Sequence, residues 1–431
     1  MNKFVLVLFC CFKLSKSGDS TRRVGSNHGS TRWNRSESSD SGDSEHFHDF
    51  SNSTEHNENF SQYFHPTNIT DSTESIFPVN STQLNLVINS SLVNWRCPNI
   101  SIPIIFNQLS SSSPSSYSYS SSPSLSTPPL SCQCEVSRTL RCDGVVSGNK
   151  KQTKHILSTI INSIRNKEEN ESITLLDLSI QGVQFIPVNI FQDLDIRGLV
   201  LSTGNLVNIS SKSFQGLEDF LVALGLPGNK LESIPLQAIS ILRGLTRLDL
   251  SGNSLGGVYS LPDLPDLEYL DISRNRIEVL AAGVFQTLPN LKHLILSENR
   301  LDLNSIREYN LNHLSYLTTL DLSSNLLTGH LRSPVFDLLP SNLKILDISF
   351  NNLTGLELNT FNILGSLNQL FLQGNLLDEI EDDSFSGLSR LHNLDLSHNN
   401  ILTLSDKSFS GLTELVFLSL SHNHLQVVFF I

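Results

Sequence analysis

A single apolar pattern recurs through the C-terminal part of the chain and constrains its fold more than any other feature. The pattern reads Leu-x-x-Leu-x-Leu-x-x-Asn-x-Leu, and one copy consists of Leu245, Leu248, Leu250, Asn253 and Leu255. Eleven units follow one another from residue 173, at spacings of 22 to 26 residues and most often 24. One unit cannot bury its own apolar residues, so this period predicts a solenoid of stacked units. The Asn position of the units is occupied by Gln181, Gly204, Asn229, Asn253, Asn275, Asn299, Asn325, Asn351, Asn375, Asn399 and Asn423.

Each unit is expected to contribute one short strand followed by a polar turn. In Leu320-Asp321-Leu322, the alternation of a strand turns both leucines inward and the aspartate outward. Strands of stacked units then pair in parallel and form a sheet along the inner, concave face. The Asn side chain lies where the chain leaves the strand, and its amide can both donate to and accept from backbone groups that the turn leaves unpaired. Ten residues later, aromatic side chains are expected to fill the convex side: Phe191, Phe214, Phe285, Phe361, Phe385 and Phe409.

The N-terminal part of the chain has a different composition. Residues 1–17 combine a charged start, an apolar run and small residues, which is typical of a secretory signal peptide. Residues 18–131 are rich in Ser, Asn and Thr and are predicted to form a disordered arm. Residues 132–172 hold a cysteine cluster and the apolar positions of a short helix, which is expected to lie across the open end of the stack. The helix positions are Ile156, Leu157, Ile160, Ile161 and Ile164. The repeats occupy 173–431 without a comparable C-terminal cover. Either the chain continues beyond Ile431, which is the favoured interpretation, or a partner covers the exposed end.

The cysteines indicate an oxidising compartment. Removal of the signal peptide leaves Cys97, Cys132, Cys134 and Cys142. An even number of cysteines in an exported chain predicts two disulfides. Cysteines two apart rarely bond to each other, so Cys132 and Cys134 are each expected to pair with Cys97 or Cys142. Zinc ligation by the Cys-x-Cys pair is an alternative, although no histidine lies nearby.

Ten Asn-x-Ser/Thr triplets predict that the exported chain is a glycoprotein. A single triplet means little in a Ser/Asn-rich sequence, but ten on an exported chain form a consistent signal. The acceptors are Asn34, Asn52, Asn59, Asn68, Asn80, Asn89 and Asn99 in the arm, and Asn170, Asn208 and Asn352 beyond it.

These features resemble the extracellular leucine-rich repeat family over about residues 132–431. The resemblance rests on the 24-residue frame, on the Phe ten residues after the Asn, and on the Cys-x-Cys cap. A narrower similarity to the chaoptin-type cell-surface proteins of invertebrates is carried by Gly182 to Pro187, Phe191-Gln192-Asp193-Leu194, Phe214-Gln215-Gly216-Leu217 and Leu231 to Pro235.

The resemblance implies an α/β-type repeat solenoid, a leucine-rich repeat horseshoe with a parallel β-sheet on its concave face. It also implies a disulfide-bonded N-terminal cap in which Cys97 pairs with Cys134 and Cys132 with Cys142. In the family's usual cap the first cysteine lies a few residues before the Cys-x-Cys pair, whereas 34 residues separate Cys97 from Cys132 here. The function implied is adhesive or receptor binding at the cell surface.

Charge and motifs argue against several function classes. The formal net charge of -13 provides no basic field for phosphates, so nucleic acid is not an expected partner. Residues 252–256 match the G-x-S-x-G motif of serine hydrolases, but Asn253 and Leu255 are repeat positions, and no His or acid partner is placed for Ser254. The sequence holds no phosphate loop, dinucleotide fingerprint or H-E-x-x-H motif. We therefore expect no enzyme activity, no cofactor and no metal, although the stretch from His46 to His56 could hold a metal weakly.

The outward positions of the strands are the candidate binding residues. An acid recurs between the two leucines, and it is interpreted as hydrogen-bonded to the following turn; the alternative is a negative strip that steers a basic partner. Positions where the wall turns apolar or aromatic are candidate anchors for a partner. The acids are Asp177, Asp249, Asp271, Asp321, Asp347 and Asp395, of which Asp321 and Asp347 are placed in the predicted site. The anchors are Tyr269, Ile295, Phe350, Phe371 and Phe417.

The sequence is therefore interpreted as a secreted or surface-attached module that binds an extracellular protein, or a second copy of itself, in cell adhesion. An ectodomain fragment of a Toll-like signalling receptor is an alternative of the same class. A serine hydrolase is the alternative of a different class. No stretch is long and apolar enough for a transmembrane span.

Overall fold

The computed structural model describes residues 130–135, 138–146, 149–165, 173–309 and 311–426. The predicted signal peptide, nearly all of the predicted arm, Cys97, Asn170 and residues 427–431 lie outside this part of the chain.

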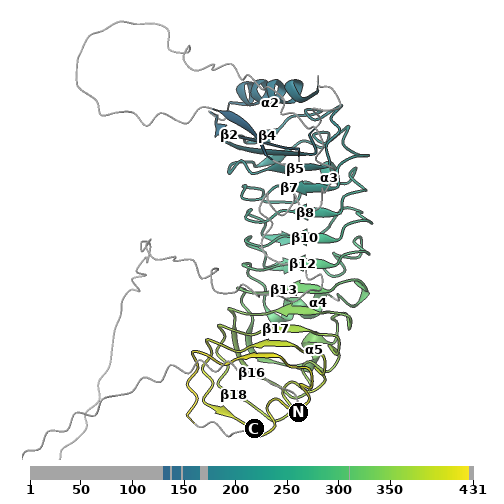
Figure 1. Ribbon diagram of the computed structural model, residues 1–431. Helices are drawn as coiled ribbons and strands as arrows, with labels where there is room; N and C mark the ends of the chain where they lie inside the picture. Colours follow the sequence, from purple (N-terminus) through teal and green to yellow (C-terminus); the bar gives the residue numbers. More distant parts are fainter. Residues whose placement is uncertain (1–129, 136–137, 147–148, 166–172, 310, 427–431) are drawn as a thin grey trace, which may run out of the picture. The chain divides into compact units, whose positions relative to one another are not determined.

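A sheet of 13 strands runs through the described part, and its strands follow one another in chain order (Figure 1). The first two strands, β1 (Ser131–Glu135) and β2 (Thr139–Val145), form an antiparallel hairpin. All later strands pair in parallel, one from each of the eleven predicted units. They are β3 (Leu175–Gln181), β5 (Gly198–Leu201), β7 (Ala223–Gly225), β8 (Arg247–Asp249), β10 (Tyr269–Asp271), β12 (His293–Ile295), β13 (Thr319–Asp321), β15 (Ile345–Asp347), β17 (Gln369–Phe371), β19 (Asn393–Asp395) and β21 (Phe417–Ser419). These strands confirm the predicted leucine-rich repeat solenoid.

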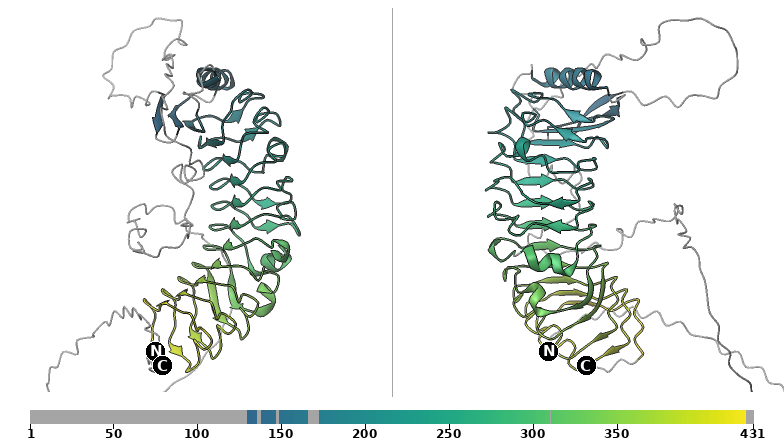
Figure 2. Two further views of the ribbon diagram at one scale, coloured as in Figure 1. Left: turned by 45° about the vertical axis from the view of Figure 1, so that its right-hand side comes forward. Right: turned by 180° about the vertical axis from the view of Figure 1, so that it is seen from behind.

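The return segments of the coils carry short elements on the side away from this sheet (Figure 2). Four two-stranded parallel sheets pair neighbouring coils: β4 (Phe185–Ile186) with β6 (Asn208–Ile209), β9 (Gly257–Val258) with β11 (Val279–Leu280), β14 (Thr328–Leu331) with β16 (Asn352–Leu356), and β18 (Glu379–Ile380) with β20 (Thr403–Leu404). The helical turns are α3 (Leu236–Ile239), α4 (Leu303–Tyr309), η4 (Leu311–His313) and α5 (Ser333–Phe336).

Leucines and phenylalanines of successive coils form one continuous core. The inward leucines of the strands, such as Leu248, Leu294 and Leu346, have no solvent exposure. On the far side, the predicted aromatic anchors stack from coil to coil: Phe361 and Phe385 have ring centroids 6.1 Å apart, and Phe385 and Phe409 6.0 Å. The prediction that these aromatics fill the convex side is confirmed.

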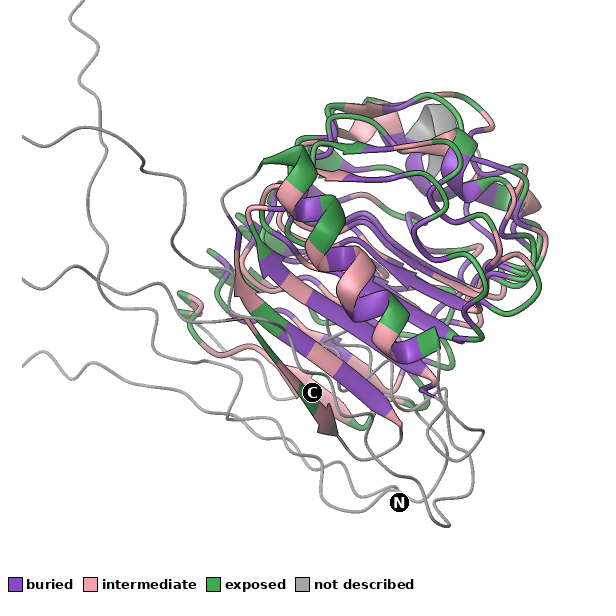
Figure 3. Cartoon of the chain, turned by 90° about the horizontal axis from the view of Figure 1, so that it is seen from above, coloured by how far each residue is buried: buried purple, intermediate pink, exposed green. Residues whose placement is uncertain are grey.

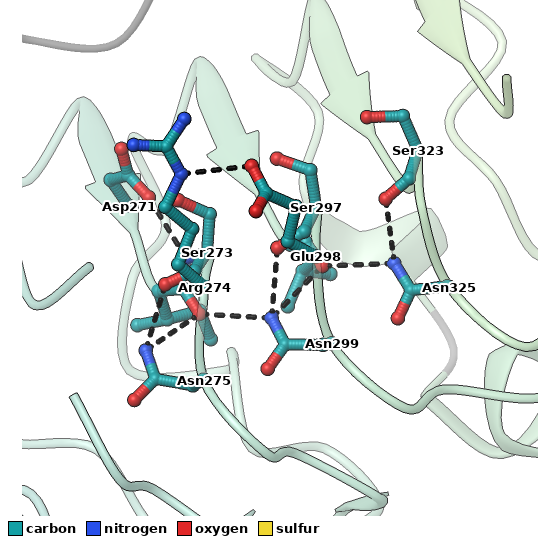
Figure 4. A network of polar contacts seen from close by, with 11 residues as sticks. Asp271, Ser273, Arg274, Asn275, Ser297, Glu298, Asn299, Ser323 and Asn325 are labelled. Atoms are coloured by element: carbon teal, nitrogen blue, oxygen red, sulfur yellow. Dashed lines mark hydrogen bonds and ion pairs between the residues drawn. The ribbon is translucent and has the colours of Figure 1, made fainter. Parts of the chain in front are cut away.

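The asparagines form the predicted ladder between coils (Figure 4). Asn325 is representative: its Nδ2 donates to the Leu296 carbonyl of the preceding coil at 3.0 Å and to the Leu322 carbonyl of its own coil at 3.1 Å. Its Oδ1 accepts the N–H of Leu301 at 3.0 Å. One side chain thus satisfies buried backbone groups of two coils, and the same contacts recur from Asn229 to Asn423.

We expect Asn325→Ala to lower the free energy of unfolding by about 1–3 kcal/mol, because the buried Leu301 N–H loses its partner and the Leu296 carbonyl keeps only the amide of Asn299. Denaturant titration measures this change. Asn290→Ala is the control, since the Asn290 amide makes a single exposed hydrogen bond to the Pro265 carbonyl. Equal unfolding midpoints for Asn325→Ala and the unmodified chain would contradict a stabilising role of the ladder.

The N-terminal end of the stack carries the predicted helix and disulfide-bonded cap, and the structure shows that the cap is a β-hairpin. Cys132 and Cys142 lie directly opposite each other on β1 and β2 and form a disulfide, as the family resemblance implied. Cys134 is also disulfide-bonded, whereas Cys97 lies outside the described residues. The helix α2 (Lys150–Arg165) buries Leu157, Ile160, Ile161 and Ile164. It is longer than the apolar spacing indicated and lies across the end of the coils (Figure 3).

Candidate binding face

Two rows of outward side chains run across the sheet, and the strand register fixes their order. The central row contains the residue after the inward leucine of each strand, and the flanking row contains the residue before it. The central row reads Asp177, Val200, Gly225, Asp249, Asp271, Ile295, Asp321, Asp347, Phe371, Asp395 and Ser419. The flanking row reads Leu175, Gly198, Ala223, Arg247, Tyr269, His293, Thr319, Ile345, Gln369, Asn393 and Phe417.

The recurring aspartates hydrogen-bond to the turn that follows each strand. The N–H of Ser251 donates to Asp249 Oδ1 at 2.8 Å, and this local bond explains why Asp precedes Ser in so many units. The same bond, at 2.9 Å, joins Ser273 to Asp271, Ser323 to Asp321, Ser349 to Asp347 and Ser397 to Asp395. The interpretation of these acids as turn residues is confirmed for the five units.

Two pairs of these carboxyl groups are neighbours on adjacent strands, which places like charges side by side. Asp249 faces Asp271, and Asp321 faces Asp347. Burial and, after it, the charge of Asp271 raise the pKa of Asp249 to about 7. Burial and the charge of Asp321 likewise raise the pKa of Asp347 to about 7. Burial also raises the pKa of Asp271. Burial and the neighbouring carboxyl groups therefore disfavour the ionised form of these aspartates in the folded chain.

Asp177, at the N-terminal end of the central row, has a counter-ion that the repeat pattern did not reveal. Arg141 of β2 pairs with it, with 2.9 Å between Arg141 Nε and Asp177 Oδ2. Elsewhere in the described part, the ion pairs do not include Asp321, Asp347 or Asp395.

Two of the five predicted anchors are not exposed, which corrects the expectation from sequence. Tyr269 and Ile295 are each 7% exposed. The Arg247 guanidinium lies 4.5 Å from the centroid of the Tyr269 ring, and the His293 ring lies 6.0 Å from it on the other side. Neighbouring side chains of the flanking row thus shield Tyr269, and neither residue offers a surface large enough for an anchor.

The other three anchors are accessible but do not all lie in one place. Phe371 is half-buried in the central row between Asp347 and Asp395, and Phe417 is half-buried in the flanking row. Phe350 is 58% exposed and lies beyond the strand, directly before the ladder residue Asn351. The sheet face from β13 to β21 therefore brings together Phe371, Phe417 and the acids, but not Phe350.

The remaining site predictions concern modification and catalysis. Asn208 and Asn352 are exposed, as glycan acceptors must be, and the eight other acceptors lie outside the described residues. Asn253 and Leu255 of the G-x-S-x-G match are buried in the ladder and the core. The part of the chain that the structure describes contains no cluster of three or more His, Cys, Asp or Glu residues suited to a metal ion. Within that same part, none of the helices combines the length and the apolar character that a bilayer span requires.

The chain matches the protein family described as "Leucine rich repeat" at residues 219–277, 265–327, 342–364 and 365–425. It is 32% identical to Tsukushi of Gallus gallus over 204 residues, which is 47% of this chain and 54% of that protein. It is 34% identical to Podocan of Mus musculus over 158 residues, 36% of this chain and 25% of that protein. It is 39% identical to Transforming growth factor beta activator LRRC32 of Mus musculus over 152 residues, 34% of this chain and 19% of that protein. The chain thus spans about half, or less, of the length of these relatives.

Proposed function

We propose that the sheet face from β13 to β21 binds an extracellular protein and that this binding serves cell adhesion. The supporting observation is the position of Phe371, an accessible aromatic side chain flanked in the same row by Asp347 and Asp395. Protein interfaces commonly have aromatic residues at the centre and polar residues at the rim. We also propose that the chain is a chaoptin-like protein and that it is secreted or attached to the cell surface. The similarity to Transforming growth factor beta activator LRRC32 supports a role in protein binding.

The charge of this face indicates the chemistry of the partner. No Lys or Arg of the described part forms an ion pair with Asp321 or Asp347, and burial together with the charge of Asp321 keeps the pKa of Asp347 high. A basic side chain of a partner would relieve this repulsion, while an apolar side chain could cover Phe371. We infer a partner surface with Lys or Arg beside an apolar residue.

Phe371→Asp tests the proposal, and we expect it to weaken binding at least about tenfold, since loss of a central aromatic anchor costs roughly 2 kcal/mol or more. Binding is measured as the attachment of fluorescent beads, coated with the purified chain, to cells of its own organism. In a second assay without cells, clustering of the beads measures self-association. Circular dichroism and thermal unfolding should be unchanged, because the Phe371 side chain projects from the core.

Tyr259→Asp is the matched control, since Tyr259 is an aromatic residue with 73% exposure in the turn after β9, away from the sheet face. It should bind like the unmodified chain. Equal binding by Phe371→Asp and Tyr259→Asp would remove the sheet face from the interface.

A further inference from the structure

Large apolar side chains are exposed beside the sheet in the coils that follow β13 and β17. Leu326 is 54% exposed and Leu376 is 43% exposed. Each directly follows a ladder asparagine, and each donates its backbone N–H to the equivalent carbonyl of the preceding coil: Leu326 to Leu301 at 2.9 Å and Leu376 to Leu353 at 2.8 Å. In the other coils from Asn205 to His424 the residue at this position is polar or charged, so the two leucines distinguish this part of the flank.

Asn352 occupies the same position in the coil between them. Its backbone N–H donates to the Leu327 carbonyl at 2.8 Å, and its side chain is exposed. Asn352 therefore lies with Leu326 on one side and Leu376 on the other. It is the acceptor residue of the triplet Asn352-Leu353-Thr354.

Phe350 completes this patch and is held in place by the next coil. Its backbone has a φ of 51°, and its N–H donates to the Gln373 carbonyl at 2.8 Å. Its ring lies directly against Gly374, where an added Cβ would come within 2.5 Å of a ring carbon. A side chain at Gly374 would thus displace the ring. Phe350 and Asn352 lie immediately before and after Asn351, whose side chain points into the coil, and both of them are exposed.

We propose that Asn352 carries an N-linked glycan whose first N-acetylglucosamine packs on the Phe350 ring and covers Leu326 and Leu376. In forming it, Asn352 Nδ2 bonds to the anomeric carbon of the sugar of a lipid-pyrophosphate-linked oligosaccharide. The bond from that carbon to the pyrophosphate oxygen breaks, the lipid pyrophosphate leaves with the bonding electrons, and the amide loses one proton. The C–H groups of a pyranose face are slightly positive and suit the negative face of an aromatic ring.

This assignment gives the exposed ring a role other than partner binding. A glycan on Asn352 closes the flank next to Phe371 and leaves the sheet face itself open. The proposal does not depend on the identity of any protein partner, because it concerns a modification of this chain and its effect on stability.

Asn208 provides a natural comparison within the same solenoid. It is an exposed acceptor in Asn208-Ile209-Ser210, but the residue two positions before it is Leu206, which is fully buried. A glycan on Asn208 has no aromatic ring at that position, so its removal should leave the stability of the solenoid nearly unchanged.

The experiment uses the full chain secreted from eukaryotic cells, with peptide mapping by mass spectrometry and thermal unfolding. We expect Asn352 to be glycosylated and Asn352→Gln to lower Tm by about 2–4 °C, with a much smaller change for Asn208→Gln. An endoglycosidase that leaves only the first N-acetylglucosamine should preserve the Tm of the unmodified chain.

The Phe350 variants separate sugar packing from a simple structural role of the ring. Phe350→Leu should lower Tm in the glycosylated chain but not in the Asn352→Gln background, while Phe350→Trp should keep the Tm of the unmodified chain. An unmodified Asn352 peptide would overturn the proposal. Additive losses from Phe350→Leu and Asn352→Gln would overturn it as well, because they would show that ring and sugar do not interact.

Discussion

Replacing Phe361 by alanine is expected to lower the free energy of unfolding by about 3–5 kcal/mol. Phe361 has no solvent exposure, and its ring stacks between Phe336 at 5.7 Å and Phe385 at 6.1 Å, measured between centroids. The substitution removes the apolar area of the ring, leaves a cavity between two coils, and breaks aromatic contacts on both sides. Because each coil is stabilised mainly by its neighbours, the damage should reach coils beyond the mutated one.

Urea titration gives the loss of stability, and amide hydrogen exchange shows where it falls. We expect faster exchange in β15, β17 and β19, close to the substitution, than in β3 and β5. Phe220→Ala is the control, because Phe220 is 45% exposed and its truncation should change the free energy by less than about 0.5 kcal/mol. A loss below about 1 kcal/mol for Phe361→Ala would show that the stacked rings contribute little beyond their neighbours.

The repeat pattern predicted most of the solenoid because it describes a local environment that recurs in every coil. Leu248 and Leu346 have the same neighbours in the next coil, so a single rule for inward positions applies to both. Phe336 was not predicted as one of the stacked aromatic residues, because it lies eleven residues after Asn325 rather than ten. Its unit is longer and contains α5. Although the residue is shifted by one position in the sequence, Phe336 lies at the end of α5 and its ring still stacks on that of Phe361.

The exposure of the outward residues could not be predicted in the same way, because it depends on side chains of adjacent coils. Tyr269 has the appearance of an anchor in its own unit, yet Arg247 and His293, one unit before and one after, cover its ring. Some contacts between coils can be predicted by comparing residues that lie one repeat length apart in the sequence. Arg274 and Glu298 are 24 residues apart and form an ion pair at 2.8 Å (Figure 4).

The paired aspartates make stability depend on pH in a direction opposite to that of ordinary carboxylates. The pKa of Asp249 is raised to about 7 in the folded chain by burial and by Asp271, above the usual value of 3.8. The folded state therefore binds this proton more tightly than the unfolded state. The stabilisation is fully present below about pH 4 and is lost as pH rises through about 7. Since one pKa unit corresponds to about 1.4 kcal/mol, the loss for Asp249 is at most about 4 kcal/mol.

We expect Asp249→Asn to match the stability of the unmodified chain near about pH 5 and to exceed it near about pH 8.5, where the unmodified carboxyl is ionised. In the unmodified chain the Ser251 N–H donates to Asp249 Oδ1 at 2.8 Å. The Asn side chain keeps an oxygen that can accept the same hydrogen bond, so the turn should be preserved. Asp347→Asn should behave in the same way, because burial and Asp321 raise the pKa of Asp347 to about 7.

Asp302→Asn provides a control of opposite sign. The hydroxyl of Ser305 hydrogen-bonds to Asp302 and lowers the pKa of that carboxyl, so its stabilisation is present above the unfolded pKa and is lost as pH falls. Replacement of Asp302 should therefore reduce stability near about pH 8.5 and have least effect in acid. The urea midpoints of the three variants and of the unmodified chain, measured from about pH 5 to about pH 8.5, test these expectations. The urea midpoints of Asp249→Asn and Asp347→Asn could instead equal that of the unmodified chain at every pH. In that case the ionised carboxyl groups do not destabilise the folded chain, and their charge gives no reason to expect a basic partner at the sheet face.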